Sequence, residues 1–204
     1  MREIITKTTV YNFNELSPEA KKKAIENHAN NEFTRELNNN LFFEDTKEFF
    51  AIEYGLEIEL YYSLGYCQGD GLSFDCENLL ESKRVIGEIK EKLTTKEKAT
   101  FQKLLNSGYI YRIYTKNDAP HGHCYASKYD VDIELDVPYY KALTQLQEDV
   151  IEKVRNIVVD WYLKECKKWE QLGYEAIYYI PTFEEFEEEA DANGWEFTAE
   201  GRLY

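Results

Sequence analysis

The longest amphipathic segment of the chain is the feature that most strongly constrains its fold. Between Tyr140 and Gln171, apolar side chains recur at the three- and four-residue spacing of an α-helix. They are Leu143, Leu146, Val150, Val154, Ile157, Val158, Trp161, Tyr162 and Cys166. This spacing predicts one long helix with a continuous apolar side, and Gly173 is expected to end it.

The segment HCYASKYDVDIELDV, residues 123–137, is expected to form a long strand. In its second half, four apolar residues alternate with four acidic residues. The apolar residues are Val131, Ile133, Leu135 and Val137, and the acidic residues are Asp130, Asp132, Glu134 and Asp136. A period of two predicts a strand with one face in the core and a row of four carboxylates on the other face.

Residues 56–76 are expected to form a β-hairpin. LEIELYYSLGY, residues 56–66, alternates apolar and polar side chains as a half-buried strand does. CQGDG, residues 67–71, interrupts this strand, and LSFDC, residues 72–76, returns to extended character. Two strands on either side of a break rich in Gly and Asp predict a hairpin.

Helix-start and helix-stop signals predict two helices in the first quarter of the chain. Ser17 as N-cap and Pro18 at the first helical position begin one helix. A second helix is expected from Thr34 to Tyr54, with Gly55 as its stop. The expected core contacts of this second helix are Leu41, Phe42, Phe49, Phe50 and Ile52.

The rest of the chain is expected to hold further helices and strands. Residues 77–108 predict two helices, because Thr94 and Glu97 have the spacing of a capping box between them. A short acidic helix is expected between Thr182 as N-cap and Gly194 as stop. Strands are expected at 2–13 and 109–116, and residues 195–204 are expected to form a terminal strand or extended tail.

This order of elements favours an α+β fold. We expect an antiparallel sheet of about four to six strands covered on one face by helices, including the long C-terminal helix. Residues 1–204 are expected to form a single domain, within which 139–193 could form a helical subregion.

The formal net charge of −15 indicates which classes of molecule the protein can bind. A protein that binds phosphate backbones neutralises them with Lys and Arg, so this charge disfavours direct binding of nucleic acid. The acidic excess indicates instead a basic partner, such as a nucleic-acid-binding protein or a groove that nucleic acid normally fills. The alternative is that the charge serves only solubility, and the sequence leaves both open.

Targeting signals and cysteine usage predict a location. The chain shows no apolar segment of the signal-peptide type near its start and no apolar run long enough to span a membrane. Four cysteines are too few for the disulfide scaffold of a secreted protein. We therefore expect a cytoplasmic protein with no membrane partner.

The CQGDG segment admits a structural and a chemical interpretation. Gly69, Gly71 and Asp70 are residues that a tight turn favours. The segment is not a phosphate-binding loop, because no Gly-Lys-Ser/Thr follows it, and it lacks the spaced acidic ligands of an EF-hand. We favour the turn, and we keep Asp70 as a candidate for contact with a partner.

The histidine and cysteine residues give little support to a metal site or an enzyme. His121 and His123 could share one face of a strand with Cys67 or Cys76 nearby, but the close ligand pairs of a structural zinc site are absent. No nucleophile-elbow motif such as Gly-x-Ser-x-Gly is present. We therefore assign no catalytic residue, no metal ligand and no cofactor.

Two acidic segments are the main candidates for binding a partner. The first is the strand row, and the second is the acidic helix. Their residues are Asp130, Asp132, Glu134 and Asp136, and Glu184, Glu185, Glu187 and Glu188. Alternate carboxylates on a strand lie about 6.5–7 Å apart, close to the phosphate spacing of an extended nucleic-acid strand. The alternative interpretation is a solvated strand face whose charge prevents aggregation.

Five segments spread over most of the length carry a family resemblance: VYNFNELSPEAKKKAIEN, YYSLGYCQGDGLSF, HGHCYASKYDVDIEL, WYLKECKKWEQLGYEAI and ANGWEFTAEGRLY. In these segments the chain resembles a family of small phage- and prophage-encoded proteins that are often labelled antitoxin of a toxin–antitoxin stability system. Leu72 departs from the family pattern, which usually has a small residue there. The resemblance implies an origin in a mobile element and assigns no catalytic residues.

Three functional hypotheses follow from the sequence. The first is a phage-encoded, non-enzymatic inhibitor of a host nucleic-acid-handling protein, of the anti-CRISPR or another anti-defence type, which could act by nucleic-acid mimicry. The second is an antitoxin that neutralises a cognate toxin. The third is a metal-binding or enzymatic protein that uses the CQGDG and HGHC segments.

Overall fold

The computed structural model describes residues 7–117 and 123–204, and their contacts divide the chain into two compact units. Unit 1 consists of the described part of Met1–Leu41 together with Tyr174–Tyr204, and unit 2 is Phe42–Gly173. The expectation of a single domain over 1–204, with a helical subregion at 139–193, stays a prediction.

The α+β class is confirmed. The helices of the described residues are α1 (Pro18–Ala29), α2 (Glu32–Phe49), α3 (Lys83–Lys92), α4 (Thr95–Asn106), α5 (Gln145–Ile177) and α6 (Phe183–Asn193). The strands there are β1 (Glu59–Ser63), β2 (Gly71–Asp75), β3 (Ile110–Thr115) and β4 (Val131–Leu135). None of the helices in these described segments combines the length and the apolar character that crossing a membrane requires.

The predicted sheet of about four to six strands is wrong, because the four strands form two separate antiparallel hairpins. β1 pairs with β2, as the sequence predicted, and β3 pairs with β4. A single bridge, between Cys76 and Thr115, joins the end of one hairpin to the other. Hydrogen bonds that involve side chains also connect the two hairpins. Thr115 Oγ1 donates to the Phe74 carbonyl at 2.8 Å, and Asn117 N donates to Asp75 Oδ1 at 2.6 Å.

The strand predicted over 123–137 is much shorter in the structure, where β4 starts only at Val131. A turn precedes it, in which the Asp130 backbone N–H donates to the Ser127 carbonyl at 3.1 Å. At the other end of the chain, residues 7–10 have no regular structure and Tyr11 forms an isolated bridge with Phe197. The rest of the strand expected at 2–13, residues 2–6, lies outside the described residues.

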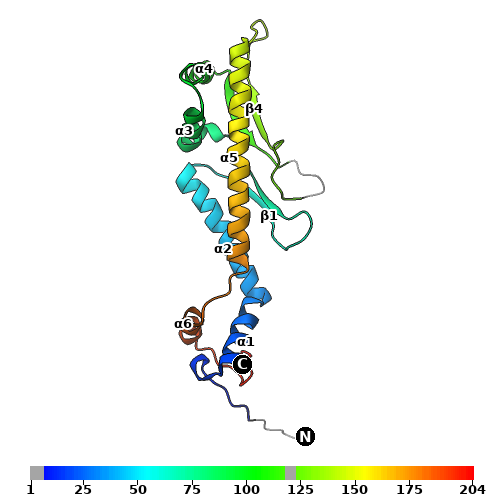
Figure 1. Ribbon diagram of the computed structural model, residues 1–204, viewed down its shortest axis with the longest axis vertical. Helices are drawn as coiled ribbons and strands as arrows, with labels where there is room; N and C mark the ends of the chain where they lie inside the picture. Colours follow the sequence, from blue (N-terminus) through cyan, green and yellow to red (C-terminus); the bar gives the residue numbers. More distant parts are fainter. Residues whose placement is uncertain (1–6, 118–122) are drawn as a thin grey trace, which may run out of the picture. The chain divides into compact units, whose positions relative to one another are not determined.

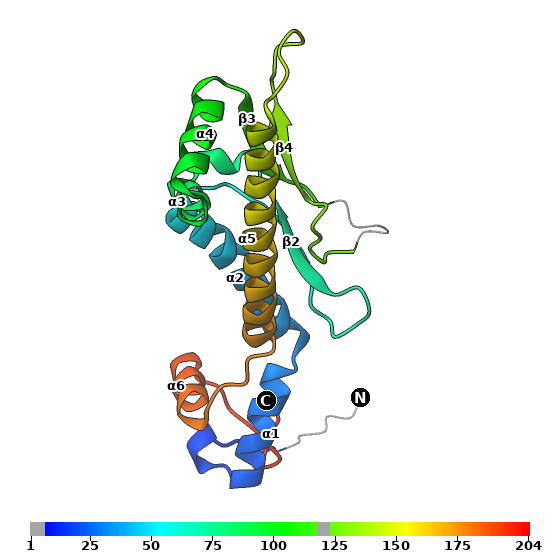
Figure 2. The same ribbon diagram turned by 45° about the horizontal axis from the view of Figure 1, so that its top comes forward.

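In unit 2, α5 lies beside both hairpins, with α3 and α4 on its other side (Figures 1 and 2). Its apolar side is buried largely as predicted, from Val150 to Cys166. Phe74 of β2 packs edge-on against Tyr162 of α5, with ring centroids 4.9 Å apart. Burying a continuous apolar stripe of this kind removes apolar surface from water and so stabilises the unit.

The predicted end of this helix at Gly173 is wrong, since α5 continues to Ile177. Gly173 is buried inside the helix, and a Cβ atom there would lie 2.4 Å from Leu64 Cδ1 and 2.8 Å from Phe42 Cζ. The glycine is therefore required by a close approach of neighbouring side chains and does not stop the helix.

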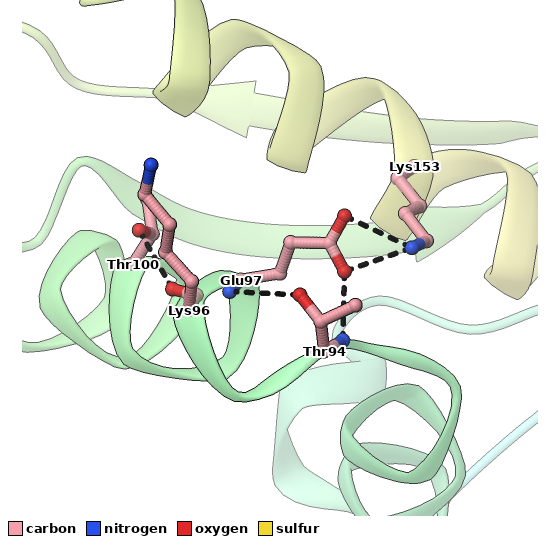
Figure 3. Close-up of polar contacts among 5 residues, drawn as sticks. All are labelled: Thr94, Lys96, Glu97, Thr100 and Lys153. Atoms are coloured by element: carbon pink, nitrogen blue, oxygen red, sulfur yellow. Dashed lines mark hydrogen bonds and ion pairs between the residues drawn. The ribbon is translucent and has the colours of Figure 1, made fainter.

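An ion pair connects α4 to α5 (Figure 3). Thr94 and Glu97 form the predicted capping box at the start of α4. The carboxylate of Glu97 also accepts hydrogen bonds from Lys153 Nζ of α5 at 2.8 and 2.9 Å. The hydrogen bond from Lys153 is the largest of the effects that lower the pKa of Glu97 to about 2.

The second predicted helix, 34–54, ends where expected, at Gly55 with φ of 65°, although its last turn, Phe50–Tyr54, is a π-helix. Phe42 and Phe50 are buried, as predicted. The prediction is wrong for Leu41 and Ile52, which are 53% and 70% exposed. Neither residue shares the helix side on which Phe42, Thr46 and Phe50 are buried.

Unit 1 has its own small aromatic core. Figure 1 shows α1 and α6 side by side, with the C-terminus next to α1. The buried cluster consists of Phe13, Leu16, Ala20, Ala24, Ile25, Phe186, Ala190 and Phe197. Ser17 caps α1 and Thr182 caps α6, both as predicted. Residues 195–204 close the core as a tail with isolated bridges at Phe197 and Leu203.

Candidate functional site

Asp70 organises the CQGDG loop between β1 and β2. Its Oδ1 accepts hydrogen bonds from Ser63 Oγ at 2.8 Å and from Cys67 Sγ at 3.0 Å. Its Oδ2 accepts one from Cys67 N at 2.9 Å. Both carboxylate oxygens therefore bond within the hairpin, in the way that Asp side chains commonly stabilise turns.

The two glycines of this loop allow it to lie against residues 123–125. Gly69 has φ of 94°, and a Cβ atom on it would lie 2.2 Å from His123 Nδ1. A Cβ atom on Gly71 would lie 2.6 Å from the Cα atom of Tyr125. The CQGDG and HCY segments, which are far apart in the sequence, are thus in close contact, and the glycines are needed for it.

The thiols of Cys67 and Cys76, the two cysteines considered for a metal site, are poorly suited to nucleophilic chemistry or metal binding. The hydrogen bond to Asp70 raises the pKa of the exposed Cys67 thiol, and burial raises the pKa of Cys76 to about 11. Both thiols are therefore protonated at neutral pH, whereas nucleophiles and metal ligands are thiolates. Over the described ranges, no three His, Cys, Asp or Glu side chains are grouped to hold a metal ion. His121 lies outside these ranges.

The predicted row of four carboxylates on one strand face is wrong at its first position. Asp130 is 2% exposed, and its Oδ2 accepts hydrogen bonds from Ser127 N at 2.7 Å and from Tyr162 OH at 3.1 Å. Alternation in the sequence cannot reveal this, because Asp130 belongs to the turn before β4 and turns toward α5.

The three other carboxylates of the predicted row differ in their neighbours. Glu134 pairs with Arg112 across the hairpin, at 3.6 Å between Oε2 and Nη1. Tyr114 OH donates to Asp132 Oδ2 at 3.5 Å. Asp132 and Asp136 are exposed, so the strand offers two exposed carboxylates in place of a row of four.

The acidic helix α6 keeps most of its predicted carboxylates at the surface. Glu184 and Glu188 are exposed, and Glu187 is half-buried. Glu185 has a structural task, because its Oε2 accepts hydrogen bonds from Thr182 N at 2.8 Å and Tyr179 OH at 2.7 Å. These bonds lower the pKa of Glu185, and the bond from the Thr182 backbone has the largest effect. Glu189 and Asp191 extend the acidic surface beyond the residues chosen from the sequence.

An apolar groove of about 440 Å³ lies next to α6 within unit 1, at residues that were not predicted as a site from the sequence. Its walls come from the last turn of α1, the first turns of α2, the segment before α6, α6 itself and the C-terminal tail. The apolar lining residues are Phe33, Leu37, Tyr179, Pro181, Trp195 and Leu203. One signal was present: Phe33 and Leu37 are four residues apart, which places them on one side of a helix.

The comparisons with known proteins give no relative on which to base an assignment. No protein-family model matches the chain, and neither the curated proteins nor the solved structures contain a significant match.

Proposed function

We propose that this protein is a phage-encoded, non-enzymatic inhibitor that binds a basic host protein of nucleic-acid handling, of the anti-CRISPR or another anti-defence type. The observation that carries the proposal is the acidic surface of α6, where six carboxylates occur in 11 residues with no Lys or Arg among them. Together with the net charge of −15, this surface favours encounter with a positively charged groove.

Nucleic-acid mimicry is part of the proposal. Exposed carboxylates on α6 would occupy positions that phosphates occupy in a basic channel, and Asp132 and Asp136 of the second hairpin form a separate candidate surface in unit 2. Glu185 adds charge to the α6 surface, but its Oε2 already accepts hydrogen bonds within the chain, and Asp130 takes no part because it is buried. Asp70 contributes through the shape of its loop, since both its oxygens hold the turn.

A purified-component assay tests this function. The tagged protein is mixed with basic CRISPR effector nucleases and other basic nucleases at about 50 mM salt, where charge steering acts over a Debye length of roughly 14 Å. We expect retention that weakens steeply as salt rises, together with loss of nuclease activity. A double variant, Glu184→Lys with Glu188→Lys, is expected to lose retention. Absence of binding at low salt across these nucleases would contradict the proposal.

An antitoxin function is the second candidate, and the sequence resemblance to proteins carrying that label favours it. The gene neighbourhood separates the two: an adjacent toxin gene, with rescue of its toxicity by co-expression of this protein, supports the antitoxin. A cluster of early phage genes supports the inhibitor.

A further inference from the structure

Four large apolar side chains are exposed in the groove of unit 1. Phe33 is 73% exposed, Leu203 is 59% exposed, and Leu37 and Tyr179 are each about half exposed. These four side chains converge on one concave surface. Contiguous exposed apolar surface with a polar rim is typical of a site that another molecule covers.

The groove has acidic residues on its α6 side. Glu189 lines it, 3.7 Å from Nε2 of His28, which lines it from α1, and Glu185 is bonded to the hydroxyl of Tyr179 in its wall. Glu185, Glu189 and Asn193 are spaced four residues apart, so they follow one side of α6. Residues 174–204 contain nine carboxylate side chains and one basic side chain, Arg202.

We propose that this groove docks a basic amphipathic segment of a protein partner. The apolar side chains of that segment would lie against Phe33, Leu37 and Leu203, and its Lys or Arg side chains would face α6. This is the helix-in-groove mode of recognition, in which apolar anchors give affinity and complementary charge gives orientation. The inference rests on the proposed function, because it names the surface and the partner chemistry through which a basic protein is held.

Charge argues for this occupant and against a second copy of the chain. A second copy would bring the same acidic helix to the same groove, and like charges across an interface oppose association. A basic segment satisfies both the apolar wall and the acidic α6 side.

The probe is a fluorescent synthetic peptide of Leu and Lys, about five helical turns long, with the Leu residues on one side. Two further peptides serve as controls: one replaces Leu with Ser, and the other replaces Lys with Glu. Binding to the full chain is followed by anisotropy at low salt. A second readout is the emission of Trp195, which lines the groove and is half-buried, whereas Trp161 and Trp169 are buried.

Matched variants assign the binding to the groove. Phe33→Ser with Leu37→Ser is expected to raise the Kd of the Leu/Lys peptide at least tenfold, and circular dichroism checks that the fold is kept. Ile52→Ser, which changes an equally exposed apolar residue of unit 2, is expected to leave the Kd unchanged. Glu189→Gln is expected to weaken binding severalfold, and Glu148→Gln, far along the sequence and exposed, is expected to have no effect.

Three outcomes would overturn the inference. Equal binding of the Ser/Lys peptide would mean that charge alone acts. Equal binding of the Leu/Glu peptide would remove the charge argument. A dimer of the free chain that Phe33→Ser disrupts would make a second copy the occupant.

These outcomes are distinct from failure of the proposed function. If the nucleases bind but Phe33→Ser with Leu37→Ser binds them equally well, the groove proposal fails and the inhibitor proposal stands. If the Leu/Lys peptide binds in the groove but no nuclease binds the protein, the inhibitor proposal fails and the groove still binds a basic amphipathic segment.

Discussion

Two helical glycines have opposite surroundings. Gly173 in α5 faces Leu64 and Phe42, whose side chains leave no room for a Cβ atom. Gly87 in α3 has no heavy atom within 4 Å of the position that a Cβ atom would take. The same substitution should therefore have opposite effects at the two sites.

We expect Gly173→Ala to lower the free energy of unfolding by about 1–3 kcal/mol, because buried neighbours must shift. Gly87→Ala is expected to raise it by about 0.5–1 kcal/mol, because alanine is the better helix former. Denaturant unfolding of both variants measures the difference. Stabilisation by Gly173→Ala would show that α5 does not pack as closely as described.

Asp130 and Glu185 show how a side chain's partners decide its role. Both are acidic residues in segments that look solvent-facing in the sequence. Tyr162 donates to the buried carboxylate of Asp130, and Tyr179 donates to the exposed carboxylate of Glu185. Burying a carboxylate without such partners is costly, so these hydrogen bonds accompany the burial of Asp130.

At the scale of elements, the Glu97–Lys153 pair links the start of α4 to α5. The folded-state pKa of Glu97, about 2, lies below its ordinary value of 4.5. This pair therefore stabilises the fold fully above pH 4.5, and its contribution is lost as the pH falls from 4.5 toward 2.

Lys153→Met is expected to raise the pKa of Glu97 toward 4.5 and to weaken the pH dependence of stability in this window. The Thr94 backbone bond stays, so the pKa should remain somewhat lowered. Carboxyl ¹³C NMR titration measures the pKa, and Lys164→Met, at an exposed position of α5, is the control. Titration of Glu97 near pH 4.5 in the unmodified protein would contradict the described contact.

The capping box of α6 holds the acidic helix in place. Thr182→Ala removes the oxygen that accepts from Glu185 N and is expected to cost about 1 kcal/mol of stability. Thermal unfolding followed by circular dichroism checks this. Thr182→Ser keeps the capping oxygen and should behave nearly as the unmodified protein. An equal loss in both variants would assign the effect to the lost methyl group.

At the scale of the whole molecule, the net charge determines how strongly the protein attracts a cationic partner. The pI is about 4.7, so protonation of carboxylates removes most of the net charge as the pH falls from 7 toward 5. Binding of a cationic probe should weaken in the same direction, because long-range attraction depends on net charge.

A fluorescent oligolysine peptide tests this dependence by anisotropy between pH 7 and 5. We expect its affinity to fall severalfold over this range, and to fall also at pH 7 when about 0.5 M salt screens the charges. An uncharged Ser peptide of equal length is the control. An affinity that does not change with pH would mean that few carboxylates take part.

Local signals in the sequence determined where several helices begin and end and where one hairpin forms. The caps at Ser17, Thr94 and Thr182 and the stops at Gly55 and Gly194 lie where the sequence predicted them. So does the hairpin around CQGDG. These features depend on residues that are close together in the sequence, and sequence patterns reveal them for that reason.

Only the tertiary structure decided the rest. It separated the four strands into two hairpins, carried α5 past Gly173, buried Asp130 and left Leu41 exposed. It also brought Phe33, Tyr179 and Leu203 together in one groove beside α6. Each of these outcomes depends on contacts between residues far apart in the chain, such as Gly173 with Leu64 or Asp130 with Tyr162. Periodicity shows which residues share a side of an element, but it does not show which element covers that side.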